Sequence, residues 1–315
     1  MRPVAVITAM AVRRASCACL GALCALCILC TMSGLIAAAP IESRAAASNL
    51  TKGCVEKFDP MADYFPDKLA IEDAANFGVE YRRSYKVVTI KEAYAGGPRE
   101  RYVLAQCGTP APPLVGELSG AQAVAVPLTS LFVLSPTHLA PLVDLDRVGV
   151  LTGVAQRDVV LDPQAWARID DGRVVEFNKV GGVIDVERVV TARPSLLMTS
   201  GTPSATFSVI RNAGVPVVAN TEWLEPTALG RAEWLKYMAL FLNEERKAQA
   251  LYGAMKVRYR SLSARVIARP DVERPLVMTG RSARGVFTIA GGRSYVAALI
   301  KDAGGRYAWT DNTAA

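Results

Sequence analysis

Side chains able to perform chemistry are few in this chain of 315 residues. His138 is the only histidine, so a metal site made of several histidines is excluded, as is any mechanism that needs two of them. The glycine-flanked serine segment Gly280–Gly285 has the wrong spacing for a hydrolase nucleophile, and no phosphate-binding glycine loop or paired-histidine zinc motif occurs. A Ser-His-Asp triad would have to use His138, which no nucleophile motif accompanies. These features disfavour an enzyme and favour a protein that binds a ligand.

Groups suited to binding lie in loops that follow predicted strands, where α/β proteins hold their ligands. The candidate ligand contacts are Ser135, Thr137, His138, Ser200, Gly201, Trp223, Arg281, Arg293 and Tyr295. Arginine forks onto carboxylate or catecholate oxygens, and aromatic rings stack on planar ligand parts. For four of these residues a structural alternative stays open: His138 as a helix cap or surface residue, Trp223 as a core residue, and Arg281 and Arg293 as ordinary surface residues.

The elements that would position these residues follow from the hydrophobic pattern. A loop is predicted for 54–68, and 77–91 alternates as a strand pair broken near 82–84. Further strands are predicted at 101–107, 122–126, 131–134, 148–154, 195–199, 215–219, 275–279 and 286–290. Helices are predicted at 136–145, 185–192, 203–213, 226–243, 244–268 and 294–303, with Ser135 and Asp185 as N-caps. Alternating strands and helices from 122 onward indicate a mostly parallel sheet.

The helix over 244–268 is too long for a connector inside one compact domain, so we interpret it as a strut between two lobes. The predicted fold class is therefore α/β, with two lobes containing parallel sheets joined by one long α-helix and an incomplete second lobe. The domains are a signal or anchor segment at 1–47, an N-terminal α/β lobe at 48–243, the interlobe helix at 244–268 and a partial C-terminal α/β lobe at 269–315.

The N-terminus reads as an export signal. Arg13 and Arg14 precede an uncharged stretch at 15–41, and small residues follow up to Ala47. Because about 20 apolar residues can span a bilayer, retention of 15–41 as a membrane anchor stays open. Cleavage after Ala47 would leave Cys54 and Cys107 in an oxidising compartment, where they would form a disulfide or remain two buried thiols.

Composition agrees with an exported globular protein. Hydrophobic residues make up 51% and charged residues 21%, which allows a sizeable core. The net charge is +7, and removal of 1–47 would take four basic residues and one acidic residue and leave about +4. The basic residues form no dense cluster, and together with export this argues against a nucleic-acid partner.

Four segments carry a resemblance to a known family. They are IDVERVVTARPSLLM (184–198), AGVPVV (213–218), GRAEWLKYMALFLNEERKA (230–248) and GGRSYVAALIKDAGGRYAW (291–309). In this order, behind an export signal and around one long helix, they resemble the substrate-binding proteins of ABC importers for ferric siderophores, haem and cobalamin. The resemblance covers roughly 120–309, and the region of Cys54 and Cys107 looks like an N-terminal extension of one branch.

The resemblance implies a function. An exported protein would capture a small-molecule metal chelate between its lobes and deliver it to an ABC permease, with the chelate supplying the metal coordination and no separate cofactor. Glu187 matches a family position that faces a permease arginine, although an acid favoured by the helix dipole is an alternative. The family's second lobe is longer, so we expect a truncated or frameshifted product that lacks the second docking glutamate. The other functional hypotheses are an exported α/β hydrolase-like enzyme and a truncated non-functional paralogue.

Overall fold

The structure is a computed structural model that describes residues 47–268, 270 and 273–312. These residues belong to the compact unit Ser43–Ala315, and the other unit, Met1–Glu42, lies outside the described range. The predicted export segment at 1–47 therefore lies outside the described residues except for Ala47.

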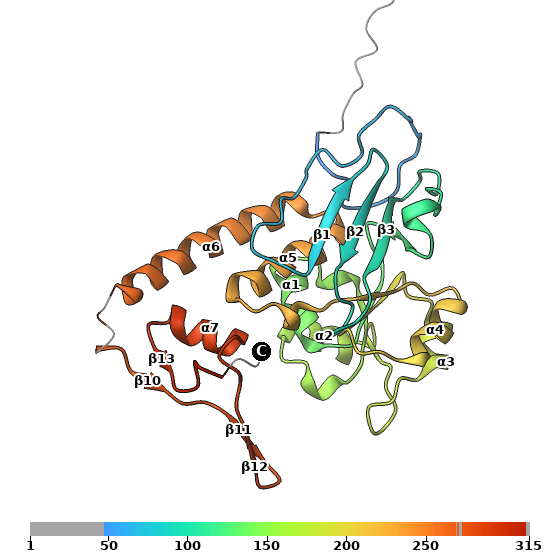
Figure 1. Ribbon diagram of the computed structural model, residues 1–315. Coiled ribbons are helices and arrows are strands. Elements are labelled where there is room, and N and C mark those ends of the chain that lie inside the picture. Colours follow the sequence, from blue (N-terminus) through green and yellow to red (C-terminus); the bar gives the residue numbers. More distant parts are fainter. Residues whose placement is uncertain (1–46, 269, 271–272, 313–315) are drawn as a thin grey trace, which may run out of the picture. The chain divides into compact units, whose positions relative to one another are not determined.

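A four-stranded sheet opens the described chain (Figure 1). β1 (Phe77–Tyr81) pairs antiparallel with β2 (Tyr85–Ile90), which confirms the predicted strand pair and its break. β2 pairs antiparallel with β3 (Glu100–Gln106), and β4 (Gln122–Val126) adds parallel to β3. The sequence pattern grouped 122–126 with the later α/β alternation. The strand joins β3 instead, because Val124 and Val126 continue the buried face of this sheet.

A five-stranded parallel sheet follows, in the order β7-β6-β5-β8-β9. Its strands are β5 (Leu131–Val133), β6 (Leu151–Val154), β7 (Val175–Glu176), β8 (Leu196–Thr199) and β9 (Val217–Ala219). Both faces are buried: Leu196 and Met198 pack into the core that contains α5, whereas Leu197 faces the smaller core with Phe207 and Ile210 of α4. This double burial explains why the strands read as continuous apolar runs.

Five helices of the described chain surround this sheet, and the two predicted caps, Ser135 and Asp185, both accept capping hydrogen bonds. The helices are α1 (Leu139–Asp144), α2 (Pro163–Asp170), α3 (Val186–Ala192), α4 (Ala205–Asn212) and α5 (Ala228–Leu242). Ser135 accepts a hydrogen bond from Thr137 N before a 3₁₀ turn that leads into α1, and Asp185 accepts one from Arg188 N at α3. α5 is buried on nearly all sides, as expected of a helix inside a core. α2 and β7 were not predicted, although Asp162 and the following Pro163 form a typical helix start.

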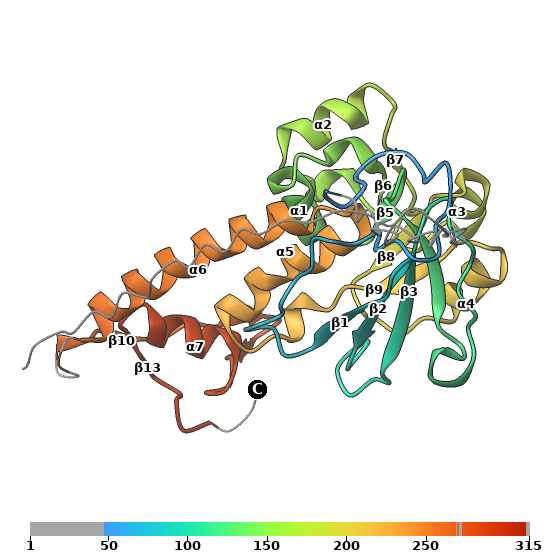
Figure 2. The ribbon, with the colours of Figure 1, turned by 90° about the horizontal axis from the view of Figure 1, so that it is seen from above.

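α6 (Glu245–Ile267) is the long helix predicted from the sequence, and Figure 2 shows its full length. After it, β10 (Leu276–Val277) pairs parallel with β13 (Arg306–Tyr307), and β11 (Arg281–Ala283) forms a hairpin with β12 (Val286–Thr288). α7 (Tyr295–Asp302) packs against α6, where Tyr259 Oη donates to Asp302 Oδ2 at 2.9 Å. The predicted α/β class, with parallel sheets and one long helix, is confirmed; β11 and β13 were not predicted.

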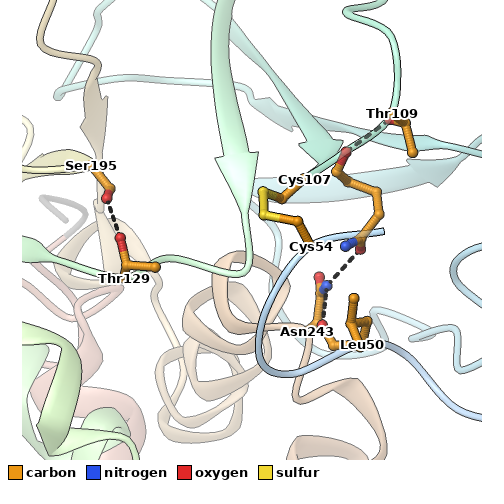
Figure 3. The surroundings of a disulfide bond; sticks show 8 residues. Leu50, Cys54, Cys107, Thr109, Thr129, Ser195 and Asn243 are labelled. Atoms are coloured by element: carbon orange, nitrogen blue, oxygen red, sulfur yellow. Dashed lines mark hydrogen bonds between the residues drawn. A yellow bond between two sulfur atoms is a disulfide. The ribbon is translucent and has the colours of Figure 1, made fainter. Parts of the chain in front are cut away.

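Cys54 and Cys107 form a disulfide, which confirms the predicted pairing over two separate thiols (Figure 3). It ties the loop before β1 to the end of β3, where Val55 N also donates to Cys107 O at 2.8 Å. Beside it, the Asn243 amide donates to Leu50 O at 2.7 Å and to Gln106 Oε1 at 2.9 Å. The N-terminal loop is thereby joined to the turn between α5 and α6.

Candidate ligand-binding site

The carboxyl ends of β5, β8 and β9 meet at one edge of the parallel sheet, because these strands are neighbours in parallel register. The loops that leave this edge carry Ser135 and Thr137 after β5, Ser200 and Gly201 after β8, and Trp223 after β9. Five of the nine predicted contacts are therefore gathered at one edge. We call this set, together with Glu222, the carboxyl edge.

Hydroxyl groups connect the loops after β5 and β9. Ser135 Oγ and Thr137 Oγ1 lie 2.8 Å apart, and Thr137 Oγ1 donates to Glu222 Oε1 at 2.6 Å. Thr137 and Glu222 are 85 residues apart in the chain. This bond holds a half-exposed serine, an exposed threonine and a carboxylate in one cluster.

Glu222 is the acidic member that sequence reasoning did not select. Its Oε2 is buried and has no hydrogen-bond partner among the described residues, and burial raises the pKa of the carboxyl above its usual value. The loop 221–223 was selected from its place after a strand, but only Trp223 was chosen from it. The available signal was a carboxylate three residues after a strand end.

Trp223 is hydrogen-bonded to the loop after β8. Its indole Nε1 donates to Ser200 O at 2.8 Å, yet 43% of the residue stays exposed, so it is not a core residue. Gly201 has φ +71°, and a Cβ there would lie 2.2 Å from Thr221 Cγ2 and 2.6 Å from Ala93 O. Glycine is therefore required by the close approach of the loops after β8 and β9.

Arg231 of α5 links Tyr295 to the carboxyl edge. This arginine was not among the predicted ligand contacts. The Arg231 guanidinium stacks 3.8 Å from the centre of the Tyr295 ring, and its Nη2 donates to Trp223 O at 2.7 Å. Tyr295 is the first residue of α7. One arginine thus joins the loop after β9 to the part of the chain that follows α6.

The remaining predicted residues do not belong to the carboxyl edge. His138 is 1% exposed, caps no helix with its side chain and has no hydrogen-bond partner for either ring nitrogen within the described chain. It occupies the N-cap position of α1 without a side-chain capping bond, and its burial makes the surface alternative wrong. Burial lowers its pKa to about 3, which keeps the ring neutral and screened from a ligand. Arg281, on the β11 hairpin, and Arg293 are exposed, and Glu187 is exposed in the first turn of α3.

A cavity of about 170 Å³ lies beside the carboxyl edge. Its lining includes Tyr94, Thr199, Gly201, Thr202, Ser204 and Arg211. These groups offer hydroxyls and a guanidinium beside apolar side chains such as Phe207, so the cavity has both hydrogen-bonding and apolar surface for a ligand.

The chemistry of this edge is that of binding. Within residues 47–268, 270 and 273–312, no group of three or more His, Cys, Asp and Glu side chains could hold a metal ion. Hydroxyls, an exposed indole and a stacked guanidinium offer hydrogen bonds and ring contacts.

Among the described residues, no helix has the length and apolar character needed to cross a membrane.

Solved structures of several known proteins are similar to this chain. A periplasmic binding protein from Veillonella parvula matches with a TM-score of 0.51 and 12% identity, over 71% of this chain and 67% of that one, which supports the fold. A possible iron-binding periplasmic protein from Staphylococcus epidermidis matches with a TM-score of 0.47 and 16% identity, over 59% and 69% of the two chains. The periplasmic vitamin B12 binding protein of Vibrio cholerae matches with a TM-score of 0.42 and 17% identity, over 59% and 68%.

A curated protein and a family model match the sequence. An uncharacterized lipoprotein of Methanocaldococcus jannaschii is 24% identical over 168 residues, which cover 49% of this chain and 39% of that protein, so the chain spans about two fifths of its length. The family described as periplasmic binding protein matches residues 143–313, more than half of the chain. The chain therefore belongs to the periplasmic binding protein family.

Proposed function

We propose that this chain is the substrate-binding component of an ABC importer, and that it captures a ferric siderophore or a related metal chelate such as haem or cobalamin. Family membership makes it a solute-binding protein and not an enzyme. The single observation that supports the ligand site is the contact set of the carboxyl edge with Arg231 and Tyr295. It joins polar groups after three strands to the start of α7.

The proposed ligand lies against the carboxyl edge and contacts residues from both proposed lobes, 48–243 and 269–315. Trp223 offers an exposed ring for a planar or apolar ligand part, and Ser135, Thr137 and Tyr295 offer hydroxyls. Arg281 and Arg293, both exposed, would add guanidinium contacts to an anionic chelate. The chelate itself supplies the ligands of its metal, so the protein needs no metal-binding cluster of its own.

The family implies a periplasmic or extracellular location. We propose that residues 1–47 direct export, either as a cleaved signal or as an anchor through 15–41. The partner at the membrane is an ABC permease, contacted by Glu187. This exposed carboxylate lies in the first turn of α3, where its charge is free to meet an arginine. Replacing it is expected to reduce uptake in cells without changing ligand affinity.

Intrinsic fluorescence of the full chain tests the ligand proposal. A panel of ferric siderophores, haemin and cobalamin is titrated, and one member is expected to quench saturably at micromolar concentration or below. Trp223→Phe should remove most of that quenching, whereas the matched variant Trp166→Phe, on α2, should retain it. No saturable quenching by any member, in a sample with a cooperative unfolding transition, would overturn the proposed ligand class.

A further inference from the structure

A second polar cavity, of about 200 Å³, lies beside the start of β3. The lining residues that matter here are Arg99, Glu100, Arg101, Glu117, Gly120 and Arg211. It shares only Glu100 and Arg211 with the cavity beside Gly201, so it is a separate space from the carboxyl edge. Three arginines against two glutamates give its lining an excess of positive charge.

Two of these arginines form no ion pair with a carboxylate among the described residues. Arg101 lies in β3 and Arg99 directly precedes that strand, and both line the cavity. Arg101 Nη1 donates to the main-chain oxygen of Glu117 at 3.0 Å, and not to its carboxylate. Among the described ion pairs, neither Arg99 nor Arg101 meets a carboxylate, and Arg99 is exposed.

Arg211 reaches the same cavity from α4 and is held only loosely. Its Nη2 lies 3.7 Å from Glu100 Oε2 and 3.5 Å from Val217 O, both long for hydrogen bonds. Its Nε is buried and has no acceptor within the described residues. The Glu100 carboxylate is meanwhile occupied at 2.6 Å by the hydroxyl of buried Tyr102. A guanidinium with five donors is thus left with a buried donor that lacks a partner.

We infer that this cavity binds a small oxyanion of the phosphate or carboxylate type. Arg99 and Arg101 supply unpaired positive charge, and Arg211 supplies planar donors that match paired oxygen atoms. An oxyanion would give the buried Nε of Arg211 its missing acceptor. None of the nine predicted chelate contacts lines this cavity, although Glu100 and Arg211 also line the cavity beside Gly201.

Calorimetric titration of the full chain with inorganic phosphate tests this inference, with sodium chloride at matched ionic strength as the reference. Saturable phosphate binding is expected, and the double variant Arg99→Gln, Arg101→Gln should weaken it at least tenfold. The control variant Arg83→Gln, Arg258→Gln removes the same charge from exposed residues elsewhere and should leave the affinity unchanged. Arg211→Lys keeps the charge but loses the forked donors, and should also weaken binding.

Separate titrations with sulfate and acetate distinguish a tetrahedral oxyanion from a carboxylate as the natural ligand. Because neither arginine makes an ion pair among the described residues, the double variant should lose only the exposed bond from Arg101 to Glu117 O and melt close to the wild-type temperature when phosphate is absent. Equal weakening in the control variant, an affinity unaffected by the double variant, or heats reproduced by chloride would each overturn the inference.

Discussion

His138 is a residue whose chemistry is decided by its surroundings. A histidine near a helix start is ordinarily a candidate acid, base or ligand, because its pKa lies close to neutral. Here the ring is buried without partners, and its pKa falls to about 3 through burial alone. The folded protein therefore holds the neutral ring, whereas the unfolded chain binds a proton below about pH 6.5. The residue is a source of acid sensitivity and not of ligand affinity.

The sign of this effect gives a prediction. Between pH 6.5 and 3 the unfolded chain binds more protons, so stability falls as the pH falls, by about 2 kcal/mol at pH 5 from this group. His138→Leu is expected to remove this contribution to the loss of folding stability as the pH falls. Urea unfolding at pH 7 and pH 5 measures it. His138→Gln, which is polar but does not titrate, should flatten the pH dependence equally; a slope unchanged in both variants would contradict the assignment.

At the scale of elements, the segment before β1 is held by carboxylates of α5 and its preceding loop rather than by secondary structure. Glu233 accepts hydrogen bonds from the main-chain N–H groups of Glu72, Asp73 and Ala74 at 2.6–3.0 Å. Glu225 similarly accepts those of residues 75 and 76. These charge-assisted bonds explain how a loop without helix or strand stays ordered against α5.

Removing one of these carboxylates should be costly. Glu233 is fully buried and also pairs with buried Lys236 at 2.7 Å. Glu233→Ala therefore leaves three N–H groups without their acceptor, and leaves Lys236 with Ala70 O at 2.7 Å and the Glu72 carboxylate at 3.5 Å. A loss of about 3–5 kcal/mol in the free energy of unfolding is expected, measured by urea denaturation. Glu80→Ala, which breaks the exposed pair with Arg82, should cost at most about 1 kcal/mol. Similar losses in the two variants would refute the role of burial.

At the scale of the whole chain, the residues after α6 are far less buried than those before it. Every residue from Arg281 to Thr288 is exposed, whereas α5 and the strands around it form the main core. Local opening is easiest where few apolar contacts are made. Side-chain contacts of α7 with the preceding helices include Tyr259 with Asp302 and Arg231 with Tyr295.

Native-state hydrogen exchange should follow this gradient. Amides of the β11–β12 hairpin are expected to exchange fastest, those of α7 at intermediate rates, and those of β2, β3 and α5 only through global unfolding. Tyr295→Leu should accelerate exchange in α7 and leave α5 unchanged, because it removes only the stacking on Arg231. Uniform protection from 77 to 312 would show that the chain opens as one cooperative unit.

The sequence by itself determined most of the local structure. The strand pair at 77–91, the caps Ser135 and Asp185, and the long helix from Glu245 follow from patterns within a few residues of each other. Such signals are local, since alternation, helix periodicity and capping depend on neighbours in the chain. The disulfide was also predictable, because export left two cysteines.

Tertiary structure alone decided the long-range relations. It joined Thr137 to Glu222, stacked Arg231 on Tyr295, brought Arg211 to Arg99 and Arg101, and buried His138. Each of these pairings links residues far apart in sequence, and burial depends on what packs around a side chain, so no local pattern records them. The carboxyl edge could be predicted because parallel strands end at the same edge of a sheet. The partners of its side chains could not be predicted, because they depend on tertiary packing.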